Sequence, residues 1–459
     1  MGAMGTASRS VIALALASLA VAASPVHAEV SFEEKRLFTV PVPPAGWLEE
    51  DWEPIISADG RRGAALVPLW RGAKPRQEFQ SGPRGTKRCN LLVVDDRVVD
   101  PCNWSDASPT FSPDGRHVVY VRAHRHDANI YVDGTEVVRP SDVPRGAGML
   151  ADGTLAYVLA APVPKGRSKE RLIVGDHEDP PFEGLVHTTL SPDGSAVAYV
   201  GRNADRETVM VRGRKLGDFD SVYAIAWTPD GREVVVFARA LKCQPPACWC
   251  ISRGGVCVPE DHLGPGPWAF SPDGARVALV HQRSLPCDGC RPGRDDRYWV
   301  TYGAMRGPEV LDVRAGPVID ARGAHVAYAA LVAGGGVRVF RDAQPVGELL
   351  QQGGQIAFSP DGAHLAWSGS AGGHFHVFVD GVPAPAHDWV YDVKFDPAGK
   401  QVAYAARDQP GGPWRIIAGT ASGPACDWVG PLRWSADGKR VAYAARIGRE
   451  VWWKVLPVP

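Results

Sequence analysis

The chain has 459 residues, of which 45% are hydrophobic and 22% charged, and its formal net charge is -1 at pH 7. This composition is that of a folded soluble protein, and the near-zero net charge argues against a dedicated nucleic-acid-binding protein. Glycine (51 residues) and proline (40 residues) are abundant, which indicates many turns and few long helices.

The first 28 residues have the features of a secretory signal peptide. Arg9 precedes an apolar run of thirteen residues, Val11–Ala23, and small residues follow at positions 26–28. The run is too short to cross a bilayer as a helix, which takes about 20 residues. We therefore expect residues 1–28 to be cleaved, residues 29–459 to form the folded domain, and the protein to be periplasmic or secreted without inserting into a membrane.

One pattern recurs along the rest of the chain: Ser-Pro-Asp-Gly or a close variant, followed by an alternating apolar segment. Its clearest copies occupy residues 109–122, 189–201, 226–238, 269–281, 357–369, 394–406 and 433–445. Three less regular copies begin at Pro54, Gly148 and Val318. The turn glycines of these ten copies, from Gly60 to Gly438, are mostly 37 to 49 residues apart. A fixed period of this size indicates a repeat architecture.

The chemistry of the repeat predicts four antiparallel strands. In Ser-Pro-Asp-Gly, proline presets φ for the first central position of a β-turn, and glycine accepts the left-handed position. The alternating segment that follows, as at Val402 and Tyr404, has the period of a pleated strand. A second hairpin signal, Asp-Gly between apolar runs, follows in most copies, for example after Ile130. Each repeat therefore reads as strands A, B, C and D of one β-propeller blade.

These residues resemble the TolB-type, WD40-like β-propeller repeats of bacterial envelope proteins. The resemblance covers Ser57–Pro459 and implies an all-β fold of about ten four-stranded blades, but it says little about function, because propellers have many unrelated activities. Unlike TolB itself, this sequence shows no α/β domain before the blades. The resemblance therefore does not imply a role in the Tol system.

The two ends of the repeat region predict how the ring closes. The last copy supplies strands A and B and Val451–Val455 as strand C, and no fourth strand follows. Arg36–Val42, just before the first blade begins at Trp52, can serve as the missing outer strand and so cover two open edges. We expect one ring of ten blades; two smaller propellers are the alternative.

Strand order assigns the loops to two faces. The A–B and C–D turns share one face, and the B–C loops share the other face with the D–A connections. Loop length varies mostly on this second face, and two of its loops are basic, so they are the candidate binding surface. The candidate residues are Arg71, Lys74, Arg76, Arg84, Lys87, Lys165, Arg167 and Lys169. These residues are interpreted either as charged side chains that only contact solvent or as a binding site for an anionic envelope polymer or an acidic protein patch.

Tryptophan follows Asp or Asn shortly before strand A in several repeats, at Trp52, Trp104, Trp389 and Trp428. A ring of tryptophans could stack on sugars. We favour the other interpretation, in which these side chains wedge between blades, because large aromatic residues supply much of the burial in a core.

Nine cysteines in an exported chain favour disulfides. If Asp95 and Asp96 form a two-residue turn, Cys89 falls opposite Cys102, and we predict a bond between them. The pairing of Cys243, Cys248, Cys250, Cys257, Cys287 and Cys290 stays open; a zinc site at two of these pairs is the less favoured alternative to disulfides. Cys426 is expected to be a buried thiol.

No linear motif of a hydrolase, metalloprotease or nucleotide-binding enzyme occurs in the sequence. His374 with His376, and His124 with His126, are interpreted as surface histidines rather than metal ligands. The sequence thus favours a monomeric, non-catalytic binding scaffold without a cofactor that recognises an envelope protein or anionic polymer. The alternative is a carbohydrate-active propeller enzyme, a glycosidase or lyase, built from scattered carboxylates at the central funnel.

Overall fold

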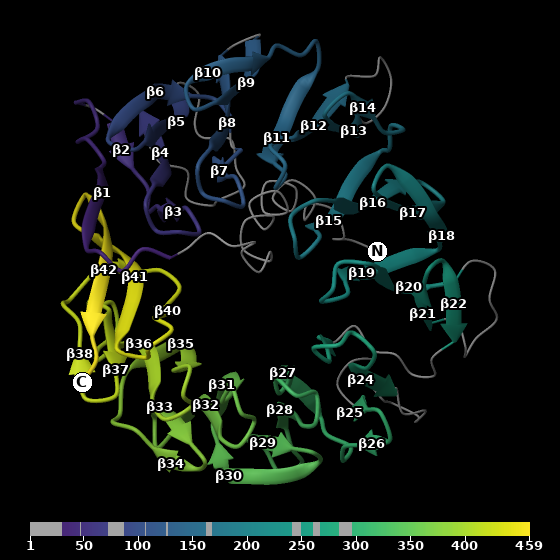
Figure 1. The fold of residues 1–459 in the computed structure, drawn as a ribbon, viewed down its shortest axis with the longest axis vertical. Helices are drawn as coiled ribbons and strands as arrows, with labels where there is room; N and C mark the ends of the chain where they lie inside the picture. Colours follow the sequence, from purple (N-terminus) through teal and green to yellow (C-terminus); the bar gives the residue numbers. More distant parts are fainter. Residues whose placement is uncertain are drawn as a thin grey trace.

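The computed structural model describes residues 30–45, 47–71, 87–105, 107–124, 127–161, 168–240, 249–259, 267–283 and 296–459. All regular structure in these residues is β: 42 strands form ten antiparallel sheets, which stand as the blades of one ring (Figure 1). In this part of the chain no helix has the length and hydrophobicity needed to span a bilayer. The predicted propeller of ten four-stranded blades is confirmed, as one ring rather than two.

The strands of each blade follow one another from the central opening outward, as strands A, B, C and D. Blade 1 has a divided inner strand and consists of β2 (Trp47–Glu49), β3 (Ile55–Ile56), β4 (Gly63–Arg71), β5 (Lys87–Val94) and β6 (Arg97–Asn103). Blade 2 consists of β7 (Thr110–Phe111), β8 (Val118–His124), β9 (Asp127–Val132) and β10 (Thr135–Val138). Blade 3 consists of β11 (Val143–Met149), β12 (Leu155–Ala161), β13 (Lys169–Val174) and β14 (His177–Glu178).

The next three blades repeat this order. Blade 4 consists of β15 (Gly184–Leu190), β16 (Val197–Asn203), β17 (Arg206–Val211) and β18 (Arg214–Phe219). Blade 5 consists of β19 (Ser221–Trp227), β20 (Val234–Arg239), β21 (Trp249–Arg253) and β22 (Val256–Pro259). Blade 6 consists of β23 (Ala269–Phe270), β24 (Val277–Arg283), β25 (Arg297–Tyr302) and β26 (Met305–Arg306).

The last four blades lead back to the start of the ring. Blade 7 consists of β27 (Asp312–Ile319), β28 (Val326–Leu331), β29 (Val337–Arg341) and β30 (Gln344–Leu350). Blade 8 consists of β31 (Gln352–Phe358), β32 (Leu365–Ala371), β33 (His374–Val379) and β34 (Val382–Pro383). Blade 9 consists of β35 (Trp389–Phe395), β36 (Val402–Arg407), β37 (Arg415–Ala418) and β38 (Ala421–Ser422). Blade 10 consists of β39 (Trp428–Val429), β40 (Arg433–Trp434), β41 (Arg440–Ile447), β42 (Glu450–Pro457) and β1 (Lys35–Thr39).

Each turn between strands A and B is stabilised by its own side chains. In blade 6, Ser271 Oγ donates a hydrogen bond to Asp273 Oδ1 (2.5 Å) and accepts one from the backbone N–H of Arg276 (2.9 Å). Gly274 completes the turn with a φ of +69°, a conformation that favours glycine. The turn glycines of all ten repeats have positive φ, which confirms the prediction of ten such turns.

Blade 9 has its turn aspartate at the first position instead of the third, where Ala398 stands. Asp396 is buried, and its Oδ1 accepts hydrogen bonds from the backbone N–H groups of Lys400 (2.6 Å) and Gln401 (2.8 Å). In the common form of the turn the aspartate and serine oxygens accept these two bonds separately, as in blade 8. One carboxylate thus replaces two side chains.

This difference gives a direct test of the turn. Asp396→Ala is expected to lower the free energy of unfolding by about 2 kcal/mol, because two backbone N–H groups lose their acceptor. The double variant Asp396→Ser/Ala398→Asp restores the common form and is expected to recover most of the loss. Urea unfolding followed by tryptophan fluorescence measures both variants, and equal losses in the two would contradict this explanation.

The ring closes through the N-terminal strand β1, which pairs with β42 at the edge of blade 10 (Figure 1). This confirms that residues before the first blade complete the last one. The strand ends at Thr39 rather than at the predicted Val42, because Pro41 has no N–H to continue the ladder. Blade 1 begins at Trp47 rather than at the predicted Trp52, because β2 also pairs with β4.

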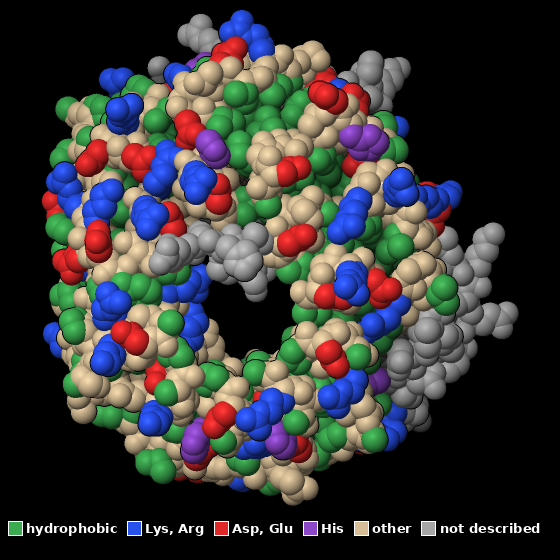
Figure 2. All heavy atoms as spheres, viewed as in Figure 1, with side chains coloured by type: hydrophobic (Ala, Val, Ile, Leu, Met, Phe, Trp, Pro, Cys, Tyr) green, Lys and Arg blue, Asp and Glu red, His purple; other side chains and the backbone are tan. Residues whose placement is uncertain are grey.

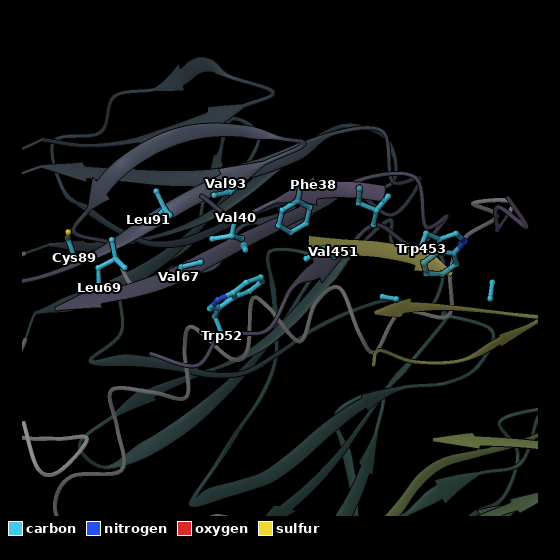
Figure 3. Close-up of a cluster of buried hydrophobic side chains, with 14 residues drawn as sticks. Phe38, Val40, Trp52, Val67, Leu69, Cys89, Leu91, Val93, Val451 and Trp453 are labelled. Atoms are coloured by element: carbon cyan, nitrogen blue, oxygen red, sulfur yellow. The ribbon is translucent and has the colours of Figure 1, made fainter. Parts of the chain in front are cut away.

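A buried cluster joins the first and last blades (Figure 3). Phe38 is fully buried, and it packs with Val67 of blade 1 and Val451 of blade 10. Trp453 belongs to the same cluster, and its Nε1 donates a hydrogen bond to the carbonyl of Ser31 (2.7 Å). The two ends of the chain therefore share one hydrophobic core.

Candidate functional site: the B–C face

The topology gives the ring two unlike faces around its central opening. All strands A start on the side of the B–C loops and D–A connections, which we call the B–C face, and they end at the A–B turns, on the turn face. Figure 2 shows one face, with acidic, basic and apolar side chains intermixed around the opening.

The predicted basic residues are partly described. Arg71 ends β4 and is exposed, and Lys169 begins β13 and is exposed. Lys87 begins β5, and its Cα is paired with that of Arg71. All three positions are on the B–C face of blades 1 and 3. Lys74, Arg76, Arg84, Lys165 and Arg167 lie outside the described residues, so their joint action as a binding site stays a prediction.

Arginines at the ends of strands B are paired with aspartates on this face. Arg407 Nε lies 2.8 Å from Asp388 Oδ2, and Arg446 Nη2 lies 3.0 Å from Asp51 Oδ1. Arg446 also covers the ring of Trp52, with 4.9 Å between the guanidinium carbon and the ring centroid. Sequence reasoning missed these pairs because their members are 19 and 395 residues apart. They neutralise much of the positive charge on this part of the face.

Exposed large hydrophobic side chains also gather on the B–C face. Twelve such side chains occur in the described residues, and eight of them lie at its strand ends and connections: Val42, Leu48, Trp104, Val143, Tyr223, Leu349, Trp389 and Ile447. The turn face has Val98, Val256 and Val382, and Val137 lies in an outer strand. All three exposed aromatic residues in the described part are on the B–C face. Exposed apolar groups of this kind indicate interaction surfaces when they are clustered.

The four predicted tryptophans divide into two groups. Trp52 is buried in the core that joins blades 10 and 1, and Trp428 packs against the same core, as expected of wedges. Trp104 and Trp389 are instead 52% and 42% exposed. The ring of Trp389 nevertheless packs on Phe375 of blade 8, with 4.4 Å between the ring centroids, so it contacts the neighbouring blade as a wedge would. Trp104 is half exposed and is therefore not a buried wedge.

The wall of the central opening contains charged residues that join neighbouring blades. Figure 2 shows Lys and Arg side chains on this wall near blades 9 and 10, whose inner strands contain Lys394 and Arg433. Asp392 Oδ2 accepts a hydrogen bond from the backbone N–H of Leu432 (2.6 Å), and its Oδ1 lies 2.9 Å from Lys394 Nζ. Lys394 Nζ in turn donates to the carbonyl of Leu432 (3.0 Å). These groups connect the inner strands of blades 9 and 10.

The predicted disulfide between Cys89 and Cys102 is present, with the two Cα atoms 5.0 Å apart. The strand register from which we predicted this disulfide is wrong. The hairpin begins as expected, with Val94 facing Arg97, but the register then shifts on both sides of Leu92. The two cysteines are therefore not directly opposite each other.

A buried carboxylate and a proline, Pro101, lie where the register of β6 shifts. Asp100 is fully buried, and its Oδ1 accepts a hydrogen bond from the backbone N–H of Cys102 (3.0 Å), which competes with the ladder. Its Oδ2 also lies 2.8 Å from His124 Nε2 and 3.3 Å from Arg122 Nε. Three partners thus hold this residue in a bulged strand.

The other cysteines are described in part. Cys426 is free and buried, as expected, and burial raises the pKa of its thiol to about 11. Cys250 takes part in a disulfide. Cys243, Cys248, Cys287 and Cys290 lie outside the described residues, whereas the backbone of Cys257 lies in β22 opposite Ser252.

Histidines do not gather into a metal site in the described part of the chain, where no three metal-ligating side chains cluster. His376 Nδ1 lies 2.9 Å from the carbonyl of Ala384, and His124 is paired with Asp100. His374 is exposed at the start of β33, and His126 lies outside the described residues.

A histidine on the turn face gives a pH-dependent contribution to stability. His364 Nδ1 lies 2.6 Å from Asp380 Oδ2, and this hydrogen bond raises the pKa of the imidazole. A raised pKa in the folded state means that the stabilisation is complete below about pH 6.5 and is lost as the pH rises further. The free energy of unfolding of wild type relative to His364→Gln should therefore be larger at about pH 5.5 than at about pH 8.5. Urea titrations at the two pH values measure the difference, and the opposite sign would contradict the assignment.

Comparisons with known proteins bear on the fold alone. No protein-family model matches the chain, and neither does any curated protein sequence. Among solved structures it is similar to the Dos1 propeller (10% identity, TM-score 0.34, 66% of this chain and 89% of that one). It is also similar to the β-propeller domain of the Trilobed protease from Pyrococcus furiosus (12% identity, TM-score 0.31, 59% and 91%) and to Pyrococcus horikoshii acylaminoacyl peptidase (10% identity, TM-score 0.29, 57% and 49%). Likenesses this distant carry no argument about activity, and membership of the TolB-type repeat family stays a prediction.

Proposed function

We propose that the protein is an exported, non-catalytic binding scaffold that recognises an envelope protein or an anionic polymer through its B–C face. The observation that carries the proposal is that eight of the twelve exposed large hydrophobic side chains in the described residues, including Trp104 and Trp389, lie on this face. Tryptophan and arginine are the residue types that dominate the energetics of interfaces. The basic loops of blades 1 and 3 leave the ring on the same face, next to Arg71 and Lys169.

The alternative function, a carbohydrate-active enzyme in the central opening, needs two carboxylates that can act as acid and base or as nucleophile. Asp392 is the carboxylate of inner strand β35, and it binds the backbone of the next blade and the ammonium group of Lys394. This arrangement supports a structural role for Asp392. It makes the scaffold the better explanation of the residues at this wall.

The experiment compares two variants that change the same amount of charge on opposite faces. The first changes Arg71, Lys74, Arg76, Lys165, Arg167 and Lys169 to glutamate. The control changes six exposed cations of the A–B turns to glutamate: Arg61, Arg116, Arg232, Arg322, Lys400 and Lys439. Protein starting at Glu29 is immobilised and exposed to cell-envelope extract, to dextran sulfate and to neutral dextran.

We expect the first variant to lose at least about tenfold in retained partner or dextran sulfate, and the control to retain both as wild type does. Equal losses in the two variants would show a non-specific charge effect and overturn the basic-loop site. If wild type retains nothing while turning over a glycan substrate, the scaffold proposal is wrong and the enzyme alternative replaces it.

A further inference from the structure

The connection from β1 to β2 is an exposed segment rich in proline. It contains Pro41-Val42-Pro43-Pro44, which we call the proline segment, and as a D–A connection it belongs to the B–C face. Pro41 and Pro44 are exposed, and Val42, at 77%, is the most exposed large hydrophobic side chain in the described residues. Nothing else in the described part of the chain therefore covers Val42.

The prolines restrict this segment to an extended conformation. Proline fixes its own φ and disfavours the helical region for the residue before it. Val40, Val42 and Pro43 each precede a proline, and residues 40–44 belong to no strand. These constraints favour the polyproline II helix, which needs about three residues per turn and has no internal hydrogen bonds. The four residues of the proline segment complete one such turn.

Hydrogen bonds fix both ends of the proline segment to the ring. The backbone N–H of Val40 donates to the carbonyl of Arg449 (2.9 Å), and Arg449 Nε donates to the carbonyl of Val40 (2.8 Å). The same guanidinium also donates to the carbonyl of Pro41. At the other end, the N–H of Trp47 donates to the carbonyl of Pro44 (3.1 Å). A segment held in this way loses little conformational entropy when a partner binds it.

The chemical groups of the proline segment limit how a partner can recognise it. Three of its four residues have no N–H, so the segment cannot pair as a β-strand, which needs donors at regular intervals. The segment carries no charge, and the guanidinium of Arg449 beside it is already paired with Glu49 (2.7 Å). The groups left for a partner are the pyrrolidine rings, the Val42 side chain and the carbonyls of Val42 and Pro43, to which nothing in the described residues donates.

We propose that the proline segment is the ligand for a groove of tryptophan and tyrosine side chains on a protein partner; this rests on the proposed function. Flat aromatic rings pack against pyrrolidine rings, and an indole N–H or a phenol O–H can donate to the free carbonyls. An anionic polymer has no such rings, and it meets no cation within the segment. The partner at this part of the B–C face is therefore a protein.

Pro180 and Pro181 provide a matched comparison on the same face. They are exposed in the D–A connection of blade 3, but two residues do not complete a turn of polyproline II. The next residue, Phe182, is bound to β13, because its N–H donates to the carbonyl of Glu170 (2.8 Å). We therefore expect no recognition of this proline pair.

The test uses the photo-crosslinking amino acid p-benzoylphenylalanine, which reacts with C–H bonds of peptides and glycans alike. It replaces Val42, or Val382 on the turn face as a control, in protein starting at Glu29. Both side chains are exposed, and both residues precede a proline. The protein is irradiated in cell-envelope extract, alone or with an excess of decaproline or of a Gly-Ser peptide of the same length. Mass spectrometry identifies the class of each adduct.

We expect polypeptide adducts at position 42 but not at position 382. Decaproline should lower the yield at position 42 at least about tenfold, because it occupies the groove, whereas the Gly-Ser peptide should leave the yield unchanged. Pro43→Ser/Pro44→Ser should lower the yield by a similar factor, and Pro180→Ser/Pro181→Ser should not. Thermal unfolding checks that both double variants keep the fold.

Polypeptide adducts at position 42 that persist in excess decaproline, or glycan adducts there, would overturn this inference and leave the proposed function standing. So would a lack of adducts at position 42 while immobilised wild type still retains a partner that the basic-loop variant loses. Wild type that retains nothing and forms no adduct would overturn both.

Discussion

Replacing Phe38 by alanine is expected to lower the free energy of unfolding by about 3 to 5 kcal/mol. The side chain is fully buried between the first and last blades, and the ring of Phe38 lies against the backbone of blade 1 so closely that a Cβ at Gly63 would be 2.6 Å from it. The surrounding residues belong to the separate sheets of blades 1 and 10, which cannot collapse into the cavity without breaking strand pairs within each sheet. Chemical denaturation followed by tryptophan fluorescence measures the loss.

The matched control for this variant is Val42→Ala. Val42 lies four residues further along the same segment, but its side chain is 77% exposed, and its loss should change the unfolding midpoint little. Amide hydrogen exchange provides a second readout: exchange in β42 should become faster in Phe38→Ala, while exchange in β28 on another part of the ring stays unchanged. Equal destabilisation by the two substitutions would mean that β1 does not close the ring through its buried side chains.

The effect of Phe38→Ala should extend beyond the cavity, because β1 covers the edge of β42. Several polar contacts hold the same segment, including the hydrogen bond from Arg449 Nε to the carbonyl of Val40 (2.8 Å) and the ion pair of Lys454 with Glu34 (2.7 Å). An uncovered edge strand is a template for pairing with another chain. A variant lacking residues 30–40 should therefore self-associate, which size-exclusion chromatography would detect.

The repeat could be predicted from sequence because its signals are local. A glycine such as Gly274, with the serine and aspartate before it, specifies its own turn, and the alternating residues that follow specify a strand. Ring closure was predictable for a similar reason: Arg36–Val42, just before the first copy, has the pattern of a strand that can complete the last blade. The boundaries were less accurate because Pro41, which has no N–H for the ladder, ends β1 early, and because the repeat pattern does not show the pairing of β2 with β4.

The candidate site could be predicted only in part, because its features are relations between distant residues. Arg446 and Asp51 meet because the ring closes, and no sequence spacing indicates that pair. Trp104 and Trp428 stand in similar sequence contexts, yet one is exposed and the other packs against the core. The difference depends on which residues of the neighbouring blade lie beside each tryptophan, and sequence periodicity does not describe such contacts.

Removing the disulfide between Cys89 and Cys102 is expected to cost about 3 kcal/mol of stability. The two residues are 13 positions apart, and a cross-link over a loop of this size limits the unfolded chain by about that amount. The double variant Cys89→Ala/Cys102→Ala avoids placing a hydroxyl at Cys89, which is buried. Guanidinium denaturation without reductant should show the lower midpoint.

Treatment with dithiothreitol distinguishes the contribution of this bond to stability from that of the other disulfides. Wild type treated with the reductant under unfolding conditions loses its disulfides, including that of Cys250, whereas the untreated double variant lacks only the bond between Cys89 and Cys102. The fall from the untreated to the treated double variant therefore measures the other disulfides alone. The bond under test lies beside the core that closes the ring, which contains Cys89 itself, so its loss should also speed hydrogen exchange in β5. An unchanged midpoint and unchanged exchange in the double variant would mean that the packing of Leu91 and Val93 holds this hairpin without the cross-link.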